Sequence, residues 1–267
     1  MAMWDLHVHC DLSFDGESKL SEICERAVAL GLTGFALTDH VDYDDIRLGL
    51  YPPYDWEEAR RQVEQARKVY GDRVTILRGV ELGQAHLYTD EVKDFLKKGE
   101  FDYVLASLHN LEGAPDFSCF KFSEMPPNEI LYWLTRYYNE QIEIAKAIDA
   151  DAFGHITYPL RYCFAEGVEA DLTPLLPKIG ELYDILIRKH IALEVNVSGL
   201  RKAWKTTMPD APLIALYKEH GGREIAVGSD AHHAKDLALH VPETVEALEK
   251  EGFILRNRLP DPREKGI

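Results

Sequence analysis

Six of the 11 histidines in this 267-residue chain stand at or just beyond the ends of apolar, strand-like runs. His7 and His9 lie two residues apart, so on an extended strand both imidazoles point to the same side and can bind one metal ion. Asp230 and His232 repeat that spacing near the other end of the chain. The pattern indicates metal-ligand chemistry. The six histidines are His7, His9, His40, His109, His155 and His232.

Acidic side chains occupy comparable positions. Asp15 follows the first apolar run, Asp39 directly precedes His40, Glu81 follows VTILRGV, and Asp230 lies in the motif SDAH. Imidazole and carboxylate donors without thiolates favour Zn, Mn, Fe or Co over copper or an iron–sulfur cluster. We therefore expect two or three divalent transition metals. The candidate metal ligands are His7, His9, Asp15, His40, Glu81, His109, His155, Asp230 and His232.

Each motif, taken alone, also has a structural interpretation. The two histidines of HVH can flank the edge of a sheet, and Glu81 can be a surface charge. Asp39 can merely orient His40 or cap the following helix. In SDAH, Ser229 or Asp230 can cap a helix. The occurrence of His, Asp or Glu at six separate strand ends is what favours a metal centre.

These side chains need a scaffold that brings strand ends together. Short runs that are apolar on both faces alternate with segments of helical spacing, several of which end near glycine, which indicates parallel strands with helices outside. A (β/α) barrel with about seven strands fits, and its active face lies at the carboxyl ends of the strands. A doubly wound open sheet is the alternative, but it expects a glycine-rich phosphate turn that HVHCDLSFDG does not provide. The expected strands cover 4–8, 34–38, 74–80, 101–107, 152–156, 191–197 and 224–229.

Neither a linker nor an internal repeat divides the chain, so residues 1–267 are expected to form a single domain, with 256–267 as a polar, partly loose tail. The formal net charge of −16 disfavours nucleic acid and anionic membrane surfaces as partners. No apolar run is long enough to cross a membrane, and the amino terminus lacks the pattern of a secretion signal. The 4 cysteines form no CxxC pair, and we expect a cytoplasmic protein with reduced thiols.

The motifs, in this order, resemble those of the PHP (polymerase and histidinol phosphatase) family. The matching motifs are DLHVHC, TDH at 38–40, GVE at 79–81, SLH at 107–109, GH at 154–155 and SDAH at 229–232. The resemblance spans almost the whole chain and implies a distorted (β/α)7 barrel with a trinuclear metal centre. TDHVD, GHITYPLRY and EVNVSGLRK are similar to the histidinol-phosphate phosphatase branch of that family.

The resemblance also implies how the ligands divide among three ions. His7, His9, Glu81 and Asp230 would hold the first ion. Glu81, as a bridge, would hold the second ion together with His109 and His155. Asp15, His40 and His232 would hold the third ion, where some members of the family have a histidine in the place of Asp15.

The donor set also favours an anionic substrate. Three divalent ions would carry more charge than Asp15, Glu81 and Asp230 neutralise, so a phosphomonoester suits the site. Such ions lower the pKa of a bridging water toward neutrality, which allows hydroxide to attack phosphorus without a covalent intermediate. Asp39, His232 or a second bound water would protonate the leaving group.

Arg161 and Arg201 each follow a strand-end motif by a few residues, and a guanidinium fork suits phosphate oxygens. Alternatively, these two arginines pair with carboxylates on the protein surface. The loop after TDH is rich in acidic and aromatic residues, among them Asp42 and Tyr43, and is expected to receive the cationic end of a substrate such as L-histidinol phosphate. Its alternative is a solvated loop that packs on the barrel rim.

The sequence thus predicts a phosphoric monoester hydrolase, with L-histidinol phosphate in histidine biosynthesis as the expected substrate. Three other functions remain open. One is a phosphoesterase of the same family that acts on another small ester or a nucleotide, and one is a metal-binding regulatory module without turnover. The third is a metal-dependent amidohydrolase, which usually recruits a bridging lysine that no expected strand end offers.

Overall fold

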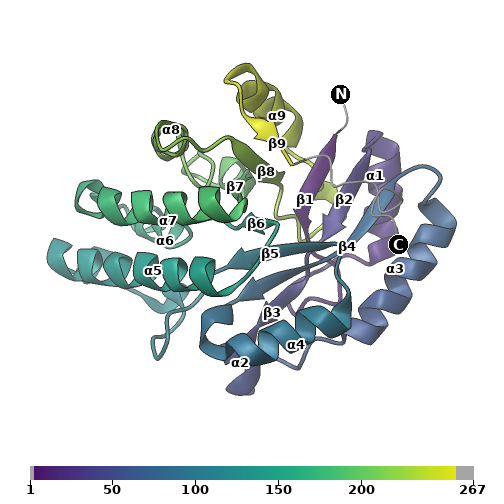
Figure 1. Cartoon of the computed structure of the whole chain (residues 1–267), viewed down its shortest axis with the longest axis horizontal. Helices are drawn as coiled ribbons and strands as arrows, with labels where there is room; N and C mark the ends of the chain where they lie inside the picture. Colours follow the sequence, from purple (N-terminus) through teal and green to yellow (C-terminus); the bar gives the residue numbers. More distant parts are fainter. Residues whose placement is uncertain (1–2, 257–267) are drawn as a thin grey trace.

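The computed structural model describes residues 3–256, and in this range strands alternate with helices along the chain. The strands are β1 (Trp4–Val8), β2 (Gly34–Leu37), β3 (His40–Asp42), β4 (Thr75–Gly83), β5 (Tyr103–Ser107), β6 (Ala152–Phe153), β7 (Ala192–Asn196), β8 (Glu224–Gly228) and β9 (Ile254–Leu255). The α-helices are α1 (Leu20–Leu30), α2 (Tyr43–Arg47), α3 (Trp56–Tyr70), α4 (Thr89–Gly99), α5 (Pro127–Ala147), α6 (Leu160–Ala165), α7 (Leu176–Lys189), α8 (Ala211–Glu219) and α9 (Val241–Lys250). The helices lie around the outside of a curled sheet (Figure 1).

All strand pairs of this sheet are parallel, in the order β1-β2-β4-β5-β6-β7-β8-β9. The short strand β3 pairs with the carboxyl-terminal residues of β4, beyond the part of β4 that pairs with β2. The carboxyl ends of β1 and β8 meet: Val8 bridges Ala231, and the Asp230 N–H donates to the His7 carbonyl at 2.8 Å. At the opposite end of β8 the neighbour is β9 instead of β1. The ring of seven strands therefore closes only on the side where the histidines lie, which makes the barrel distorted.

The inner face of the barrel changes character along each strand. A layer of buried apolar side chains fills the amino-terminal half, and polar groups follow on the same face. On β4, Leu77 belongs to the apolar layer and Glu81 lies four residues later; on β7, Ala192 is followed by Glu194. The apolar layer consists of Leu6, Ala36, Leu77, Tyr103, Leu105, Ala152, Ala192 and Ala226.

Strand β1 also contributes side chains to both the apolar and the polar layer, but its pairing with β2 is irregular. Its pairing with β2 shifts register between Asp5 and Val8, which is the signature of a bulge. Leu6 lies in the apolar layer, yet His7 points into the polar end of the barrel. The shift therefore lets consecutive residues serve both layers.

The expected barrel and its seven strands are confirmed, with differences at the margins. The run 152–156 is a strand only over β6, because the chain turns at His155 into the loop before α6. The short strands β3 and β9 and the helices α2, α4, α6 and α9 were not expected. In α4, Val92, Phe95 and Leu96 lie on one helical face, but seven charged or small polar neighbours hide that pattern in the sequence.

The predicted tail lies mostly outside the described residues. Within residues 3–256, no helix has both the length and the apolar character needed to cross a lipid bilayer.

We expect Asp5 to stabilise the closure of the barrel between β1 and β8. Its buried carboxylate accepts the N–H groups of Ser229 and Ala238, each at 2.8 Å, and the Ser229 hydroxyl. Asp5→Asn would leave an amide NH₂ facing one of these donors, so the free energy of unfolding should fall by about 1–3 kcal/mol in urea titrations. The exposed Asp72→Asn is the control, and an equal loss in both variants would contradict this role for Asp5.

Candidate metal centre

All nine predicted ligands come together at the carboxyl ends of the strands, around the carboxylate of Glu81. Its Oε2 lies 3.1 Å from both His7 Nε2 and His40 Nδ1. Its Oε1 lies 2.9 Å from His155 Nε2 and 3.1 Å from His109 Nε2. One fully buried carboxylate thus contacts four imidazoles that come from four different parts of the chain.

The set assigned to the first ion is assembled around two carboxylates. His9 Nε2 lies 3.5 Å from Glu81 Oε2 and 3.4 Å from Asp230 Oδ1. His7 Nε2 lies 3.7 Å from the same Asp230 oxygen. The spacing of two in HVH therefore places both imidazoles beside one pair of carboxylates.

The set assigned to the third ion lies nearer the opening. Asp15 Oδ2 lies 2.9 Å from His232 Nε2 and 3.5 Å from His40 Nε2. The rings of His40 and His232 both stack on His9, with centroids 4.4 and 4.3 Å away. Four groups offer three ligating atoms within 4.8 Å of one another: His9, His40 and His232; His7, His9 and Asp230; His7, Glu81 and His155; His40, Asp42 and His109.

The hydrogen-bond geometry of two histidines fits metal ions. His7 Nδ1 lies 2.6 Å from Glu194 Oε1, and His109 Nδ1 lies 2.7 Å from Asp42 Oδ1. A neutral ring that donates from Nδ1 carries a lone pair on Nε2. Both Nε2 lone pairs then face oxygens of Glu81, an arrangement that only a proton or a cation between the groups makes favourable.

His9 provides a second sign of fit. Both of its ring nitrogens are buried and lack a hydrogen-bond partner within residues 3–256. Burial, together with the neighbouring His232 and His40, lowers the pKa of His9 to about 3, so the ring is neutral. A buried nitrogen lone pair beside two carboxylates suits a divalent cation with nitrogen and oxygen ligands.

Other histidines of the cluster have the opposite shift. Burial opposes the charged form of His7, but the carboxylates of Glu81, Glu194 and Asp230 outweigh it and raise the pKa well above the usual range. For His109, burial is outweighed in the same way by Asp42 and Glu81. Without ions, these rings hold protons where ions would otherwise neutralise the carboxylates.

Two carboxylates near the ligands were not predicted for the roles that they have here. Glu194, inside the apolar run IALEVNV, contacts His7, and Asp42, predicted to receive a substrate cation, is buried against His109. A charged residue in the middle of an apolar strand is the signal that could have identified Glu194. For Asp42, at the end of β3, the sequence gives no sign that the side chain points inward to His109.

A cavity of about 160 Å³ opens onto this cluster. Arg161 lies on its wall, with Nη2 2.8 Å from the Tyr162 hydroxyl and the guanidinium carbon 4.2 Å from the centroid of the Tyr158 ring. The cavity is lined by Phe14, Asp15, His40, Asp42, Asp45, Tyr51, His109, Asn110, Asp116, His155, Tyr158, Arg161, Asp230 and His232.

The predicted ligands His7, His9 and Glu81 are buried beneath that lining, and three other predicted site residues are absent from it as well. Arg201 donates to the backbone oxygens of Ser229 and Asp230, at 2.7 and 3.1 Å, so its guanidinium supports the loop instead of facing the cavity. Tyr43 packs against Tyr88 and Phe95 because its side chain points to the outer helices.

Asp39 is the third of these residues. It is fully buried and accepts the Cys10 N–H at 2.8 Å and the Cys10 thiol at 3.4 Å. Burial raises the pKa of its carboxyl to about 7. The carboxyl joins the ends of β1 and β2 and does not reach the cavity, so of the two predicted proton donors only His232 lies on the wall.

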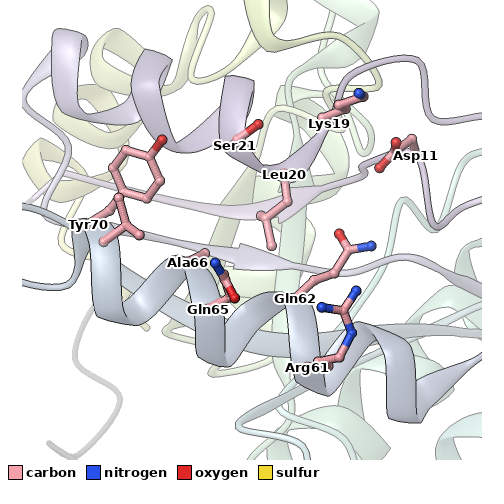
Figure 2. A pocket seen from close by; sticks show the side chains of 10 residues that line it. Asp11, Lys19, Leu20, Ser21, Arg61, Gln62, Gln65, Ala66 and Tyr70 are labelled. Atoms are coloured by element: carbon pink, nitrogen blue, oxygen red, sulfur yellow. The ribbon is translucent and has the colours of Figure 1, made fainter.

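A larger hollow of about 460 Å³ lies outside the barrel between α1 and α3 (Figure 2). It contains none of the nine predicted ligands. The Arg61 Nε and the Gln62 amide that face it already donate to Glu58, at 2.7 and 2.9 Å. This hollow therefore offers none of the predicted metal chemistry.

Known proteins match this chain over most of its length. The family model of the PHP domain matches residues 5–198. Histidinol-phosphatase of Lactococcus lactis subsp. lactis is 29% identical over 269 residues, which cover 95% of this chain and 93% of that protein. Probable histidinol-phosphatase of Thermotoga maritima is 27% identical over 252 residues, which cover 94% and 93% of the two chains.

A solved structure supports the fold. The crystal structure of histidinol phosphate phosphatase from Lactococcus lactis subsp. lactis, complexed with zinc, L-histidinol and phosphate, superposes with a TM-score of 0.80. The two chains are 22% identical, and the match covers 95% of each.

Binding of divalent ions should release protons. The pKa values of His7 and His109 lie well above the usual range in the ion-free protein, so these rings are protonated at pH 7 and an ion must displace their protons. The affinity for Zn²⁺ should therefore rise with pH. Calorimetric titration at pH 7 in two buffers of different ionisation heat measures the release, and equal heats in both buffers would contradict it.

Proposed function

Since the chain belongs to the PHP domain family, we propose that it is a metal-dependent phosphomonoesterase that hydrolyses L-histidinol phosphate to L-histidinol and phosphate. The observation that carries this proposal is the cavity itself: a cluster of metal ligands, an arginine and a set of acidic acceptors face one small space. The names of the relatives from Lactococcus lactis and Thermotoga maritima support the same reaction.

We propose that the nine ligands hold two or three divalent ions from among Zn, Mn, Fe and Co. Such ions, when bound, activate water, orient phosphoryl oxygens and offset the charge that develops during in-line displacement. Glu81 is suited to bridge two ions because its two oxygens contact different pairs of imidazoles. Thiolates are absent from the group, in accord with this choice of metals.

Arg161 supports the phosphate end of the substrate. Its guanidinium lies over the rings of Tyr158 and Tyr162, with the guanidinium carbon 4.2 and 4.7 Å from the two centroids. These contacts hold the group in place before a substrate binds, and a fixed planar fork suits two phosphate oxygens. Arg161 would thus bind the phosphate from the wall of the cavity.

Another part of the wall is suited to the cationic end of the substrate. Asp45 accepts the Asn110 amide at 3.1 Å, while the Asn110 Oδ1 is buried without a hydrogen-bond partner in the described chain. Burial and the charge of Asp42 raise the pKa of Asp45 to about 6. A bound ammonium or imidazolium would supply the missing donor and the missing positive charge, and Asp116 adds a further carboxylate.

In a protein that holds two ions, with the third set free of metal, His232 remains the candidate for proton transfer to the leaving oxygen. It lies on the cavity wall with 27% of its side chain exposed. Its Nδ1 lies 3.1 Å from the Asp230 carbonyl oxygen and its Nε2 lies 2.9 Å from Asp15. These contacts fix the ring at the opening, where a leaving alcohol would depart.

The proposed function is tested by measuring phosphate release from L-histidinol phosphate beside sugar phosphates, nucleotides and p-nitrophenyl phosphate, on protein whose metal content is known. We expect kcat/KM for L-histidinol phosphate to exceed that of every other ester by at least about 100-fold, because only this substrate satisfies both ends of the cavity. A metal-loaded protein that prefers another ester would overturn the substrate, and a protein without metal or turnover would overturn the proposed reaction.

Arg161→Ala should lower kcat/KM for L-histidinol phosphate by about 10- to 100-fold, mainly through KM, because it removes charge-assisted hydrogen bonds to the phosphate. Steady-state kinetics at saturating metal measure this effect. Arg136→Ala is the control, since Arg136 pairs with Glu140 away from the cavity. An unchanged KM in the Arg161 variant would remove this residue from the site.

A further inference from the structure

Glu194 is a buried carboxylate on the inner face of β7 that does not line the cavity. Its Oε1 lies 2.6 Å from His7 Nδ1, and its Oε2 accepts the backbone N–H of His155 at 2.7 Å. We propose that Glu194 is a positioning residue that fixes the ring of His7 and the backbone of His155 and thereby sets the affinity of the site for its ions. This inference rests on the proposed metal-dependent function.

The two contacts demand two acceptors. His7 must donate from Nδ1 if its Nε2 is to bind an ion, and the His155 backbone group can only donate. A carboxylate offers an acceptor to each donor. A glutamine in the same place has one oxygen and one NH₂ group, so whichever way it turns, one of the two donors faces another donor.

Gly228 on the neighbouring strand leaves room for this carboxylate, and Gly154 lies on its other side. A Cβ atom on Gly228 of β8 would lie 2.7 Å from Glu194 Oε1 and 2.3 Å from the Cβ of His7. A Cβ atom on Gly154, just after β6, would lie 2.4 Å from the Ser107 hydroxyl and 3.5 Å from Glu194 Oε2. The carboxylate is thus enclosed on both sides, which restricts its rotamer and the direction of its hydrogen bonds.

Asp42 differs from Glu194 in its place in the cluster. It contacts His109 Nδ1 at 2.7 Å, lies 3.5 Å from His40 Nδ1 and lines the cavity. Glu194 lies behind the cluster and contacts His7 and His155, which the family resemblance assigns to two different ions. Loss of Glu194 should therefore weaken the loading of more than one ion.

The test is the binding of Zn²⁺ alone to the full chain, measured by competition with a chelator and by metal content after dialysis. For Glu194→Gln, which preserves size, we expect binding about 10- to 100-fold weaker than in the unmodified protein. Asp102→Asn is the matched control, since Asp102 accepts the Arg78 N–H at the far end of β4 and should leave zinc binding unchanged.

A spectroscopic readout separates positioning from general stability. In zinc-loaded protein with ¹⁵N-labelled histidine, the Nδ1–H proton of His7 should resonate far downfield because of its short hydrogen bond to Glu194. In Glu194→Gln this resonance should move upfield or disappear, while those of His220 and His240, which pair with surface carboxylates, stay in place. A merely structural substitution would not shift one resonance selectively.

The outcomes are distinct. Wild-type zinc affinity together with an unmoved His7 resonance in Glu194→Gln would overturn the role of Glu194. If the glutamine variant does not fold, Glu194→Asp replaces it: the charge stays but the shorter side chain cannot reach both donors, and wild-type zinc affinity there would overturn the proposal equally. Absence of zinc binding in the unmodified protein would instead overturn the proposed function.

Discussion

One carboxylate, Glu81, holds four imidazoles within 3.1 Å, and the rest of the architecture serves to make that crowding possible. Nitrogen and oxygen lone pairs at such distances, out of contact with water, oppose one another unless cations or protons lie between them. Only a protein frame that is rigid before the ions bind can hold these side chains so close together. Parallel strands provide that frame, because their carboxyl ends converge on one face and their hydrogen bonds lie elsewhere.

Along the strand direction, the barrel places the apolar side chains that stabilise it at one half and the polar side chains of the proposed site at the other half. Leu77 and Tyr103 belong to a packed apolar layer at the amino-terminal half, and Glu81 and Ser107 follow on the same inner face at the other half. Burial of the first layer offsets part of the cost of a polar, weakly satisfied second layer. The same division explains why the closure between β1 and β8 exists only beside the ligands, where the backbone must be held.

The sequence was sufficient to predict the seven main strands and the clustering of nine His, Asp and Glu side chains, since a histidine at the end of an apolar run is visible without knowing any contact. It was insufficient wherever the direction of one side chain decides the role. Arg201 and Asp39 adjoin site motifs, yet Arg201 faces backbone carbonyls and Asp39 faces Cys10. Spacing along the chain carries no information on which side of a loop a side chain lies, and the proposed role of Glu194 depends on contacts with His7 and His155, which are distant in the sequence.

The first and last strands of the ring supply His7, His9, Asp230 and His232, so the ligand cluster is divided between the two ends of the sequence. During synthesis, a chain that has emerged only as far as β7 carries the ligands from the earlier strands but lacks the last carboxylate and imidazole. Under the assignment above, the first and third ions need Asp230 and His232 and would bind only after β8 has arrived, whereas the residues assigned to the second ion all precede β7. Ions bound to the first and third sets would then link β1 to β8, so the metal content of the protein would affect the lifetime of the closed barrel.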